Sequence, residues 1–285
     1  MDRNYWTYED CFIFKPDFND NLSIYSILIK QYKKLIFSNH RDLINSVEII
    51  KKNDFNCTNN YYWDYICSKF NQPLLNSLDT LTNLTAITFG DEFNKPLANS
   101  LNKLTNLTVI TFGLNFNQHL ANSLIQLTNL THLTFGYAFN QSLSNSLDQL
   151  ENLTYLSFGH YFSQPLENIL LKLTNLKHLV LGSGFGEFNQ ELFLPPNIKI
   201  LTVDCCNNNL IDSLPNSIEQ LILGINFFSP LDNLPNSIQT ISFDRVSLYN
   251  YPLDNLPRSL KLLELPYDYD IKVSNIPTKC KIVYL

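Results

Sequence analysis

The chain has 285 residues, of which 45 % are hydrophobic, so it is long enough to bury a sizeable core. Only 16 % of the residues are charged, against about 25 % in a typical soluble chain, while 20 Phe and 15 Tyr exclude a disordered, charge-rich tail protein. The net charge of −6 and the absence of a basic stripe argue against a dedicated nucleic-acid binder.

No segment of the sequence has the features of a secretory signal or a membrane span. The first 21 residues mix charges and aromatics, and no apolar run reaches the roughly 18 residues that a span needs. The six cysteines are irregularly spaced and form no CxxC pair, unlike a disulfide framework or a zinc site: Cys11, Cys57, Cys67, Cys205, Cys206 and Cys280. We therefore expect an intracellular, cytoplasmic protein with reduced thiols and without a cofactor or structural metal.

Residues 1–69 do not share the repeat described below and form the first predicted segment. Asp20 is placed to cap a helix over Leu22–Phe37, on which Tyr25, Leu28, Tyr32 and Leu35 share one face, and a second helix is predicted over Arg41–Lys52. One interpretation is a helical cap over the exposed core of the first repeat. Another is a degenerate repeat, because Phe18-Asn19 and Phe37 keep the Phe-to-Phe spacing seen between Phe70 and Phe89.

Residues 70–285 are dominated by an internal repeat. A 23-residue step, FNxxLxNSLxxLTNLTxLTFGxx, continues to about residue 184, and units of 20–22 residues built on LPNSI follow it. The step aligns one glycine and one leucine per unit: Gly90, Gly113, Gly136, Gly159 and Gly182, and Leu84, Leu107, Leu130, Leu153 and Leu176. Continuing the leucine column through the short units predicts ten strand starts.

The repeat sequence predicts that each unit contains one strand, one sharp turn and one return segment. Ile87 and Phe89 alternate as on a strand with one buried face, and Gly90 allows a sharp turn, with a positive φ as one option. Phe93 fills the core, and Asn94 is suited to bond the turn backbone in a ladder between repeats. Leu97, Leu101 and Leu104 have the spacing of a short helix, whereas proline favours extended return segments in the LPNS units.

A single unit cannot bury its own Leu and Phe, so neighbouring units must stack. The predicted fold class is α/β: an open leucine-rich-repeat-like solenoid with a parallel inner β-sheet, short helices or extended segments outside, and a helical N-terminal cap.

The recurring FNQPL, FNKPL and FNQSL elements, the TFG and SFG strand ends and the LPNSI segments resemble FNIP repeats, a leucine-rich-repeat relative found chiefly in social amoebae and giant DNA viruses. The resemblance covers about residues 70–266, and LTNL replaces the usual LPxSL in the first half. It implies that residues 1–69 are a degenerate F-box-like segment that docks to a ubiquitin-ligase adaptor, although the opening LP-x-E-like signature is missing.

Positions that vary between repeats on the exposed strand face are candidates for partner binding. The Thr85 column is nearly uniform, as a structural threonine ladder would be. Two other columns vary between repeats and contain Tyr and His side chains. These side chains are flat and form hydrogen bonds, as is typical of protein-binding centres. The candidate partner-binding residues are His132, Tyr137, Tyr155, His160, Tyr161 and His178.

The sequence contains no catalytic motif such as GxSxG, HExxH or GxxxxGK, and the recurring serines belong to the scaffold pattern. The neighbouring histidines lack recurring acidic partners, which argues against a metal site. We therefore predict a non-catalytic scaffold that binds a protein partner on its inner face, with substrate recognition for a ubiquitin ligase as the finer hypothesis. The alternative is a structural or virion-assembly protein without a specific ligand.

Overall fold

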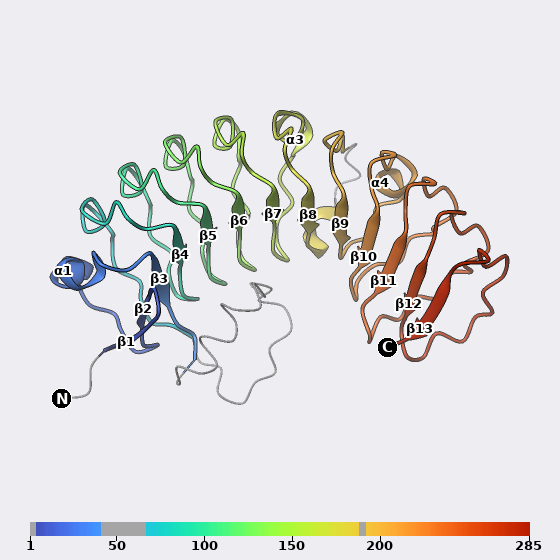
Figure 1. Ribbon diagram of the computed structural model, residues 1–285, viewed down its shortest axis with the longest axis horizontal. Coiled ribbons are helices and arrows are strands. Elements are labelled where there is room, and N and C mark those ends of the chain that lie inside the picture. Colours follow the sequence, from blue (N-terminus) through green and yellow to red (C-terminus); the bar gives the residue numbers. More distant parts are fainter. Residues whose placement is uncertain (1–3, 41–66, 188–191) are drawn as a thin grey trace. The chain divides into compact units, whose positions relative to one another are not determined.

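The computed structural model describes residues 4–40, 67–187 and 192–285 and divides the chain into two compact units, 1–153 and 154–285 (Figure 1). Each unit is a run of stacked turns with one strand per turn, which confirms the leucine-rich-repeat-like solenoid predicted from the repeat. No helix among the described residues is long and apolar enough to cross a membrane.

In the described part of the first unit, six strands follow one another in chain order in the sheet. β1 and β2 form an antiparallel hairpin, and every later pair from β2 to β6 is parallel. The elements are β1 (Tyr5–Tyr8), β2 (Cys11–Phe14), η1 (Leu22–Tyr25), α1 (Ser26–Ile29), β3 (Lys34–Phe37), β4 (Ala86–Thr88), β5 (Val109–Thr111) and β6 (His132–Thr134). In register, Ala86 pairs with Val109 and Val109 with His132, so equivalent positions of successive repeats lie side by side.

The predicted long helix over Leu22–Phe37 is wrong, because only its first half is helical. Asn21, rather than Asp20, caps η1 by accepting a hydrogen bond from the Ser23 backbone N–H at 3.0 Å. The second half contains β3, whose Phe37 ring stacks on Phe70 with centroids 4.1 Å apart. This stacking, which helical periodicity does not reveal, favours the strand. The second predicted helix, Arg41–Lys52, lies outside the described residues.

The N-terminal segment therefore contains a degenerate repeat, as the Phe-to-Phe spacing indicates. Phe18 stacks on Phe70 at 5.6 Å, and the Asn19 side chain accepts a hydrogen bond from the backbone N–H of Asn71 at 3.0 Å. Phe18-Asn19 thus makes the contacts of the FN pair in a regular repeat. It follows the β1–β2 hairpin, which forms the first two strands in the order of the sheet.

The core of the first unit contains two columns of stacked phenylalanines. Phe89, Phe112 and Phe135 directly follow their strands and stack with centroids 5.4 and 5.6 Å apart. The second column comes from the turns and runs parallel to the first: Phe70, Phe93, Phe116 and Phe139. All seven rings are at most 2 % exposed, so the core consists of the residues that the 23-residue step repeats.

The asparagine ladder predicted at the turns is present. The side-chain oxygens of Asn71, Asn94 and Asn117 each accept a hydrogen bond from the backbone N–H of the equivalent Asn in the next repeat, at 2.9–3.0 Å. None of the turn glycines has a positive φ, so the positive φ that the sequence allows at Gly90 is not adopted. Glycine is required at Gly113 and Gly136 because the backbone of the preceding repeat lies too close for a Cβ.

The return segments of the first unit are turns rather than the predicted short helices. Their backbone bonds span three residues, as in Ser100 N–H to Leu97 O at 2.9 Å, and Leu75, Ala98, Ala121 and Asn145 adopt a left-handed φ that interrupts a helix. Asn and Ser at their centres are also weak helix formers. A helix forms where the equivalent segment reads ENILLK, at α3 (Glu167–Lys172) in the second unit.

We expect Ala121→Gly to raise the free energy of unfolding by about 0.5–1 kcal/mol. Ala121 has a φ of 42°, and a left-handed backbone costs a residue with a Cβ about 1–2 kcal/mol, part of which the greater chain entropy of unfolded glycine offsets. Urea unfolding followed by circular dichroism measures the change. Ala138→Gly, at a position without a left-handed φ, is the control and should lower stability; equal losses in both variants would contradict the prediction.

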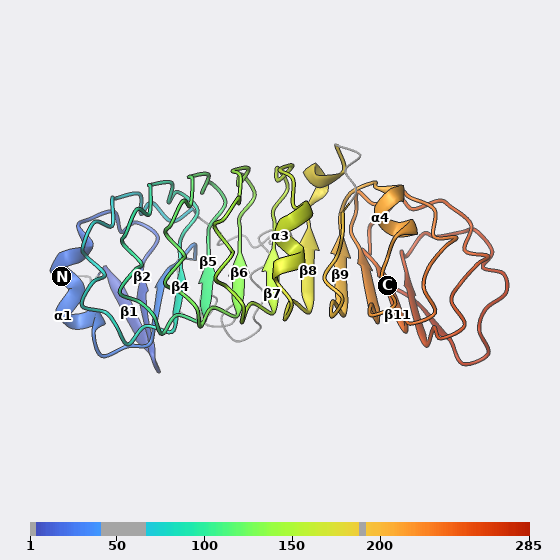
Figure 2. The same ribbon diagram turned by 90° about the horizontal axis from the view of Figure 1, so that it is seen from above.

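The residues described in the second unit form seven strands, again in chain order and parallel in every described pair. Its elements are β7 (Tyr155–Ser157), α3, β8 (His178–Leu181), η2 (Ser183–Glu187), β9 (Ile200–Val203), α4 (Asn208–Asp212), β10 (Gln220–Leu223), β11 (Thr240–Phe243), β12 (Leu262–Leu265) and β13 (Lys281–Tyr284). With β4–β6, the described residues contain all ten strands predicted from the leucine column. The LPNS segments are extended with one tight turn, in agreement with the predicted extended return segments. Figure 2 shows β7, β8, β9 and β11 of this unit in that order.

Candidate functional site

The uniform Thr column on the exposed strand face is structural. The hydroxyl of Thr108 donates to the Thr85 carbonyl at 3.0 Å, and that of Thr131 donates to the Thr108 carbonyl at 2.9 Å. Each threonine therefore ties its repeat to the preceding one. Functional side chains on this face must come from the variable columns.

The first unit contributes two of the predicted partner-binding residues, His132 and Tyr137. His132 begins β6 and is exposed, with its Nδ1 2.9 Å from the hydroxyl of Thr131, and desolvation lowers its pKa below the usual value. Tyr137 lies in the turn after β6 and is 40 % exposed. Asp91, which occupies the Tyr137 column two repeats earlier, is buried and accepts hydrogen bonds from Asn39 and Leu114, so part of this column belongs to the scaffold.

In the second unit, Tyr155 and His178 begin adjacent strands, β7 and β8. Their rings meet edge to face, with centroids 4.8 Å apart and an interplanar angle of 79°. His178 Nε2 also lies 3.2 Å from the hydroxyl of Thr202 on β9. Contacts on three strands therefore hold these side chains in fixed orientations on the strand face.

The turn after β7 places His160 beside Tyr161. Their ring centroids are 5.1 Å apart, and His160 Nδ1 is hydrogen-bonded to the hydroxyl of Ser183 in the next repeat. Tyr161 is 54 % exposed. The structure thus brings the four candidates of the second unit together as two pairs, whereas His132 and Tyr137 belong to the first unit.

The chemistry available at these positions is flat contact area and hydrogen bonding. Within the described ranges, no group of three or more His, Cys, Asp or Glu side chains is arranged to hold a metal ion. The adjacent thiols Cys205 and Cys206 lie in the turn after β9, where Cys205 is buried and Cys206 is exposed, and burial raises the pKa of Cys205 to about 12. Cys205 is therefore protonated at neutral pH and unsuited to nucleophilic attack.

Sequence reasoning missed two surfaces of the second unit. Exposed apolar side chains follow β10, β11 and β12: Ile225, Phe228, Val246, Leu248, Tyr251 and Tyr267. A polar groove crosses the LPNS segments at the opposite ends of these strands. Two features of the sequence indicate these surfaces: the irregular turn length after β11 and the change from Asn to Ser before each strand. Both lie outside the repeat positions that are aligned in the first half of the chain.

The fold and its repeating contacts define a solenoid repeat protein of the leucine-rich-repeat type. Residues 188–224 match the family model of the FNIP Repeat, in agreement with the resemblance found in the sequence. No curated protein matches the chain.

Solved structures with similar folds include the giant-virus protein CroV588, described as a novel circular LRR protein, with a TM-score of 0.57 and 24 % identity. The match covers 99 % of this chain and 50 % of CroV588, so the chain spans about half the length of that protein. An internalin of Listeria monocytogenes matches at a TM-score of 0.41, with 13 % identity over 76 % of this chain and 77 % of the internalin. Drosophila Toll, in its complex with Spätzle, matches at a TM-score of 0.45, with 21 % identity over 75 % of this chain and 38 % of the other.

Proposed function

We propose that the chain is a non-catalytic scaffold that binds a protein partner through the exposed strand face. The observation that supports this most directly is the pair of ring contacts in the second unit, Tyr155 with His178 and His160 with Tyr161. They place amphipathic rings at the starts of β7 and β8 and in the turn after β7. His132 and Tyr137 supply the same side-chain types in the first unit.

The surrounding contacts favour this role energetically. Binding costs free energy when side chains must be ordered, by about 0.5–1.5 kcal/mol for each flexible side chain. Here the rings already contact each other and hydroxyls of neighbouring repeats. Tyrosine has few rotatable bonds and is enriched among residues that dominate binding energy. The strand face therefore offers a preorganised contact area at low entropic cost.

We expect the combined variant Tyr155→Ala/Tyr161→Ala/His178→Ala to lose its protein partner. Binding centres of this kind contribute about 2 kcal/mol or more per residue, so proximity labelling in cells expressing the full chain should recover the partner at least about tenfold less well. Tyr284→Ala removes another exposed tyrosine of the same unit and is the matched control. An identical labelled set for all three proteins would contradict the proposal and favour the structural or assembly role.

The same experiment tests the finer hypothesis that the scaffold presents substrates to a ubiquitin ligase. That hypothesis comes from the resemblance of residues 70–266 to FNIP repeats, which implies an F-box-like segment at residues 1–69. It requires a ubiquitin-ligase adaptor among the labelled proteins of the full chain and of both variants, because the strand-face substitutions leave residues 1–69 intact. Its absence from all three sets would refute ubiquitin-ligase recruitment while leaving partner binding in place.

We further propose that this interaction takes place in the cytoplasm. Cys11 and Cys205 are buried free thiols, and Cys67, Cys206 and Cys280 are free as well. A chain with this many unpaired cysteines is typical of a reducing compartment.

A further inference from the structure

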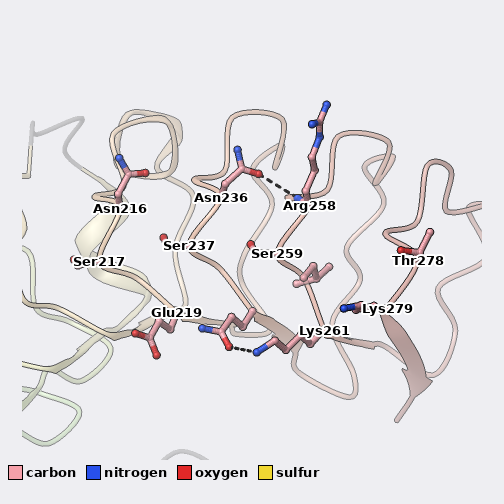
Figure 3. A pocket seen from close by; sticks show the side chains of 12 residues that line it. Asn216, Ser217, Glu219, Asn236, Ser237, Arg258, Ser259, Lys261, Thr278 and Lys279 are labelled. Atoms are coloured by element: carbon pink, nitrogen blue, oxygen red, sulfur yellow. Dashed lines mark hydrogen bonds between the residues drawn. The ribbon is translucent and has the colours of Figure 1, made fainter.

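A groove of about 610 Å³ crosses the last repeats of the second unit, where the LPNS segments lead into the strands. Figure 3 shows the side chains that line this groove, and most of them come from three sequence positions that recur from repeat to repeat. Asn216 and Asn236 lie along one side, Ser217, Ser237 and Ser259 lie between, and Glu219 and Lys261 stand at the starts of strands on the other side. The volume is within the range of about 300–1,000 Å³ that is typical of small-molecule sites.

The groove is open because serine replaces an asparagine that spans neighbouring repeats elsewhere. In the first unit, the side-chain amides of Asn106, Asn129 and Asn152 each donate to a threonine carbonyl of the preceding repeat at 2.9 Å. Ser217 and Ser237 occupy the equivalent position, directly before the residue whose N–H closes the turn. Their side chains are shorter, and both hydroxyl oxygens are buried without a hydrogen-bond partner.

These two hydroxyls favour a ligand that accepts hydrogen bonds. A buried donor without a partner costs about 1–3 kcal/mol, and rotation about χ1 moves a serine hydroxyl to another staggered position. Ser259, in the next repeat, satisfies its hydroxyl by donating to the Ile238 carbonyl at 2.6 Å. The two remaining hydroxyls are therefore donors that a ligand oxygen would stabilise.

Although the whole chain is acidic, the groove is positively charged. It is lined by Arg258, Lys261 and Lys279, and by a single carboxylate, Glu219, which is paired with Lys199 at 2.5 Å. Lys261 contacts the neutral side chain of Gln239 at 2.7 Å, so its charge is not neutralised. In the described part of the chain, none of the three lining cations forms an ion pair. Figure 3 shows Lys261 and Lys279 extending toward the preceding repeats and Arg258 at the upper rim.

We propose that this groove binds a phosphomonoester, with Lys261 and Lys279 contacting the phosphate and the hydroxyls of Ser217 and Ser237 donating to its oxygens. A phosphomonoester carries close to two negative charges and three strong acceptor oxygens, which match two cations and two hydroxyl donors. A nucleic-acid strand is a poorer match, because it requires cations along several phosphates. The site is separate from the strand-face residues and does not depend on the proposed function.

Isothermal titration calorimetry of the full chain tests the site with O-phosphoserine, inorganic phosphate, and a short phosphoserine peptide with its unphosphorylated form. We expect saturable binding of O-phosphoserine that Lys261→Gln/Lys279→Gln weakens about tenfold or more. The control Lys177→Gln/Lys272→Gln removes the same charge from the same unit outside the groove and should bind normally. Tighter binding of the phosphopeptide than of O-phosphoserine would identify a protein-borne ligand, and the reverse a free metabolite.

Ser237→Ala distinguishes the site from a general attraction to positive charge. Removing a buried hydroxyl that lacks a partner leaves folding stability unchanged or raises it, so thermal unfolding should stay at or above the wild-type midpoint. O-phosphoserine binding should nevertheless weaken several-fold. The proposal is refuted if none of the phosphate probes gives saturable heat, or if the groove and control lysine variants bind O-phosphoserine equally well.

Discussion

Replacing Gly136 with alanine is expected to lower the free energy of unfolding by about 3 kcal/mol or more, at the upper end of the costs of overpacking. A Cβ at this position would overlap the carbonyl oxygen of Gly113, lie 2.5 Å from its carbonyl carbon and lie 3.0 Å from Leu114 Cα. All three atoms are backbone, so no side-chain rotation relieves the overlap. The two repeats must move apart, and this separation also stretches the strand pairing between β5 and β6.

Urea unfolding of the full chain, followed by circular dichroism, measures this effect. The control is Ser144→Ala in the same repeat, an exposed position at which a change of about 0.5 kcal/mol or less is expected. Because each repeat contacts only its neighbours, the glycine variant should first lose structure around the interface that it separates. A loss below about 1 kcal/mol would show that the turn relaxes without separating the repeats and would contradict the prediction.

The sequence predicts the solenoid well because the same contacts recur at the same step. Phe93 and Asn94 lie in columns whose members stack or bond with their equivalents one repeat away. A repeated side chain with one repeated role leaves few alternatives, so strand positions and core membership follow from alignment. The FN pair at Phe18-Asn19 extends this reasoning into a segment that otherwise shows little repetition.

The errors occur where a local pattern fits two structures. Tyr25, Leu28, Tyr32 and Leu35 fit one helical face, yet β3 follows α1 because Leu35 and Phe37 pack into the core of the stacked sheet. The return segments of the first unit have helical leucine spacing, but left-handed residues such as Ala98 interrupt them. In both cases packing between repeats decides the backbone, and a pattern within one segment does not contain that information.

The candidate sites show the same distinction. The strand-face positions of Tyr155 and His178 follow from alignment, and their ring contact follows from adjacent strands. The groove depends on how far a serine side chain reaches and on lysines that different repeats contribute. Lys261 and Lys279 are 18 residues apart in sequence and line the same groove only after the repeats stack. Prediction of this site therefore requires the register and the side-chain lengths as well as the repeat.

Phe116→Ala is expected to lower the free energy of unfolding by about 3–5 kcal/mol, the usual cost of removing a buried aromatic ring. Phe116 is fully buried and contacts rings in three directions. It stacks on Phe112 of its own repeat at 4.0 Å, and on Phe93 and Phe139 of the two neighbouring repeats at 6.0 and 6.1 Å. One truncation therefore leaves a cavity and weakens two interfaces between repeats.

Ile125→Ala is the control, because this apolar side chain of the following return segment is 39 % exposed and should cost well below 2 kcal/mol. Phe112→Ala and the double variant complete a mutant cycle. Since the rings of Phe112 and Phe116 are nearly parallel and in contact, the cycle should give a coupling energy of about 0.5–1.5 kcal/mol. If the free-energy changes of the two single variants simply add up in the double variant, the two phenylalanine columns stabilise the fold only by filling volume. A coupling energy would show that contact between the columns adds to the stability of each repeat.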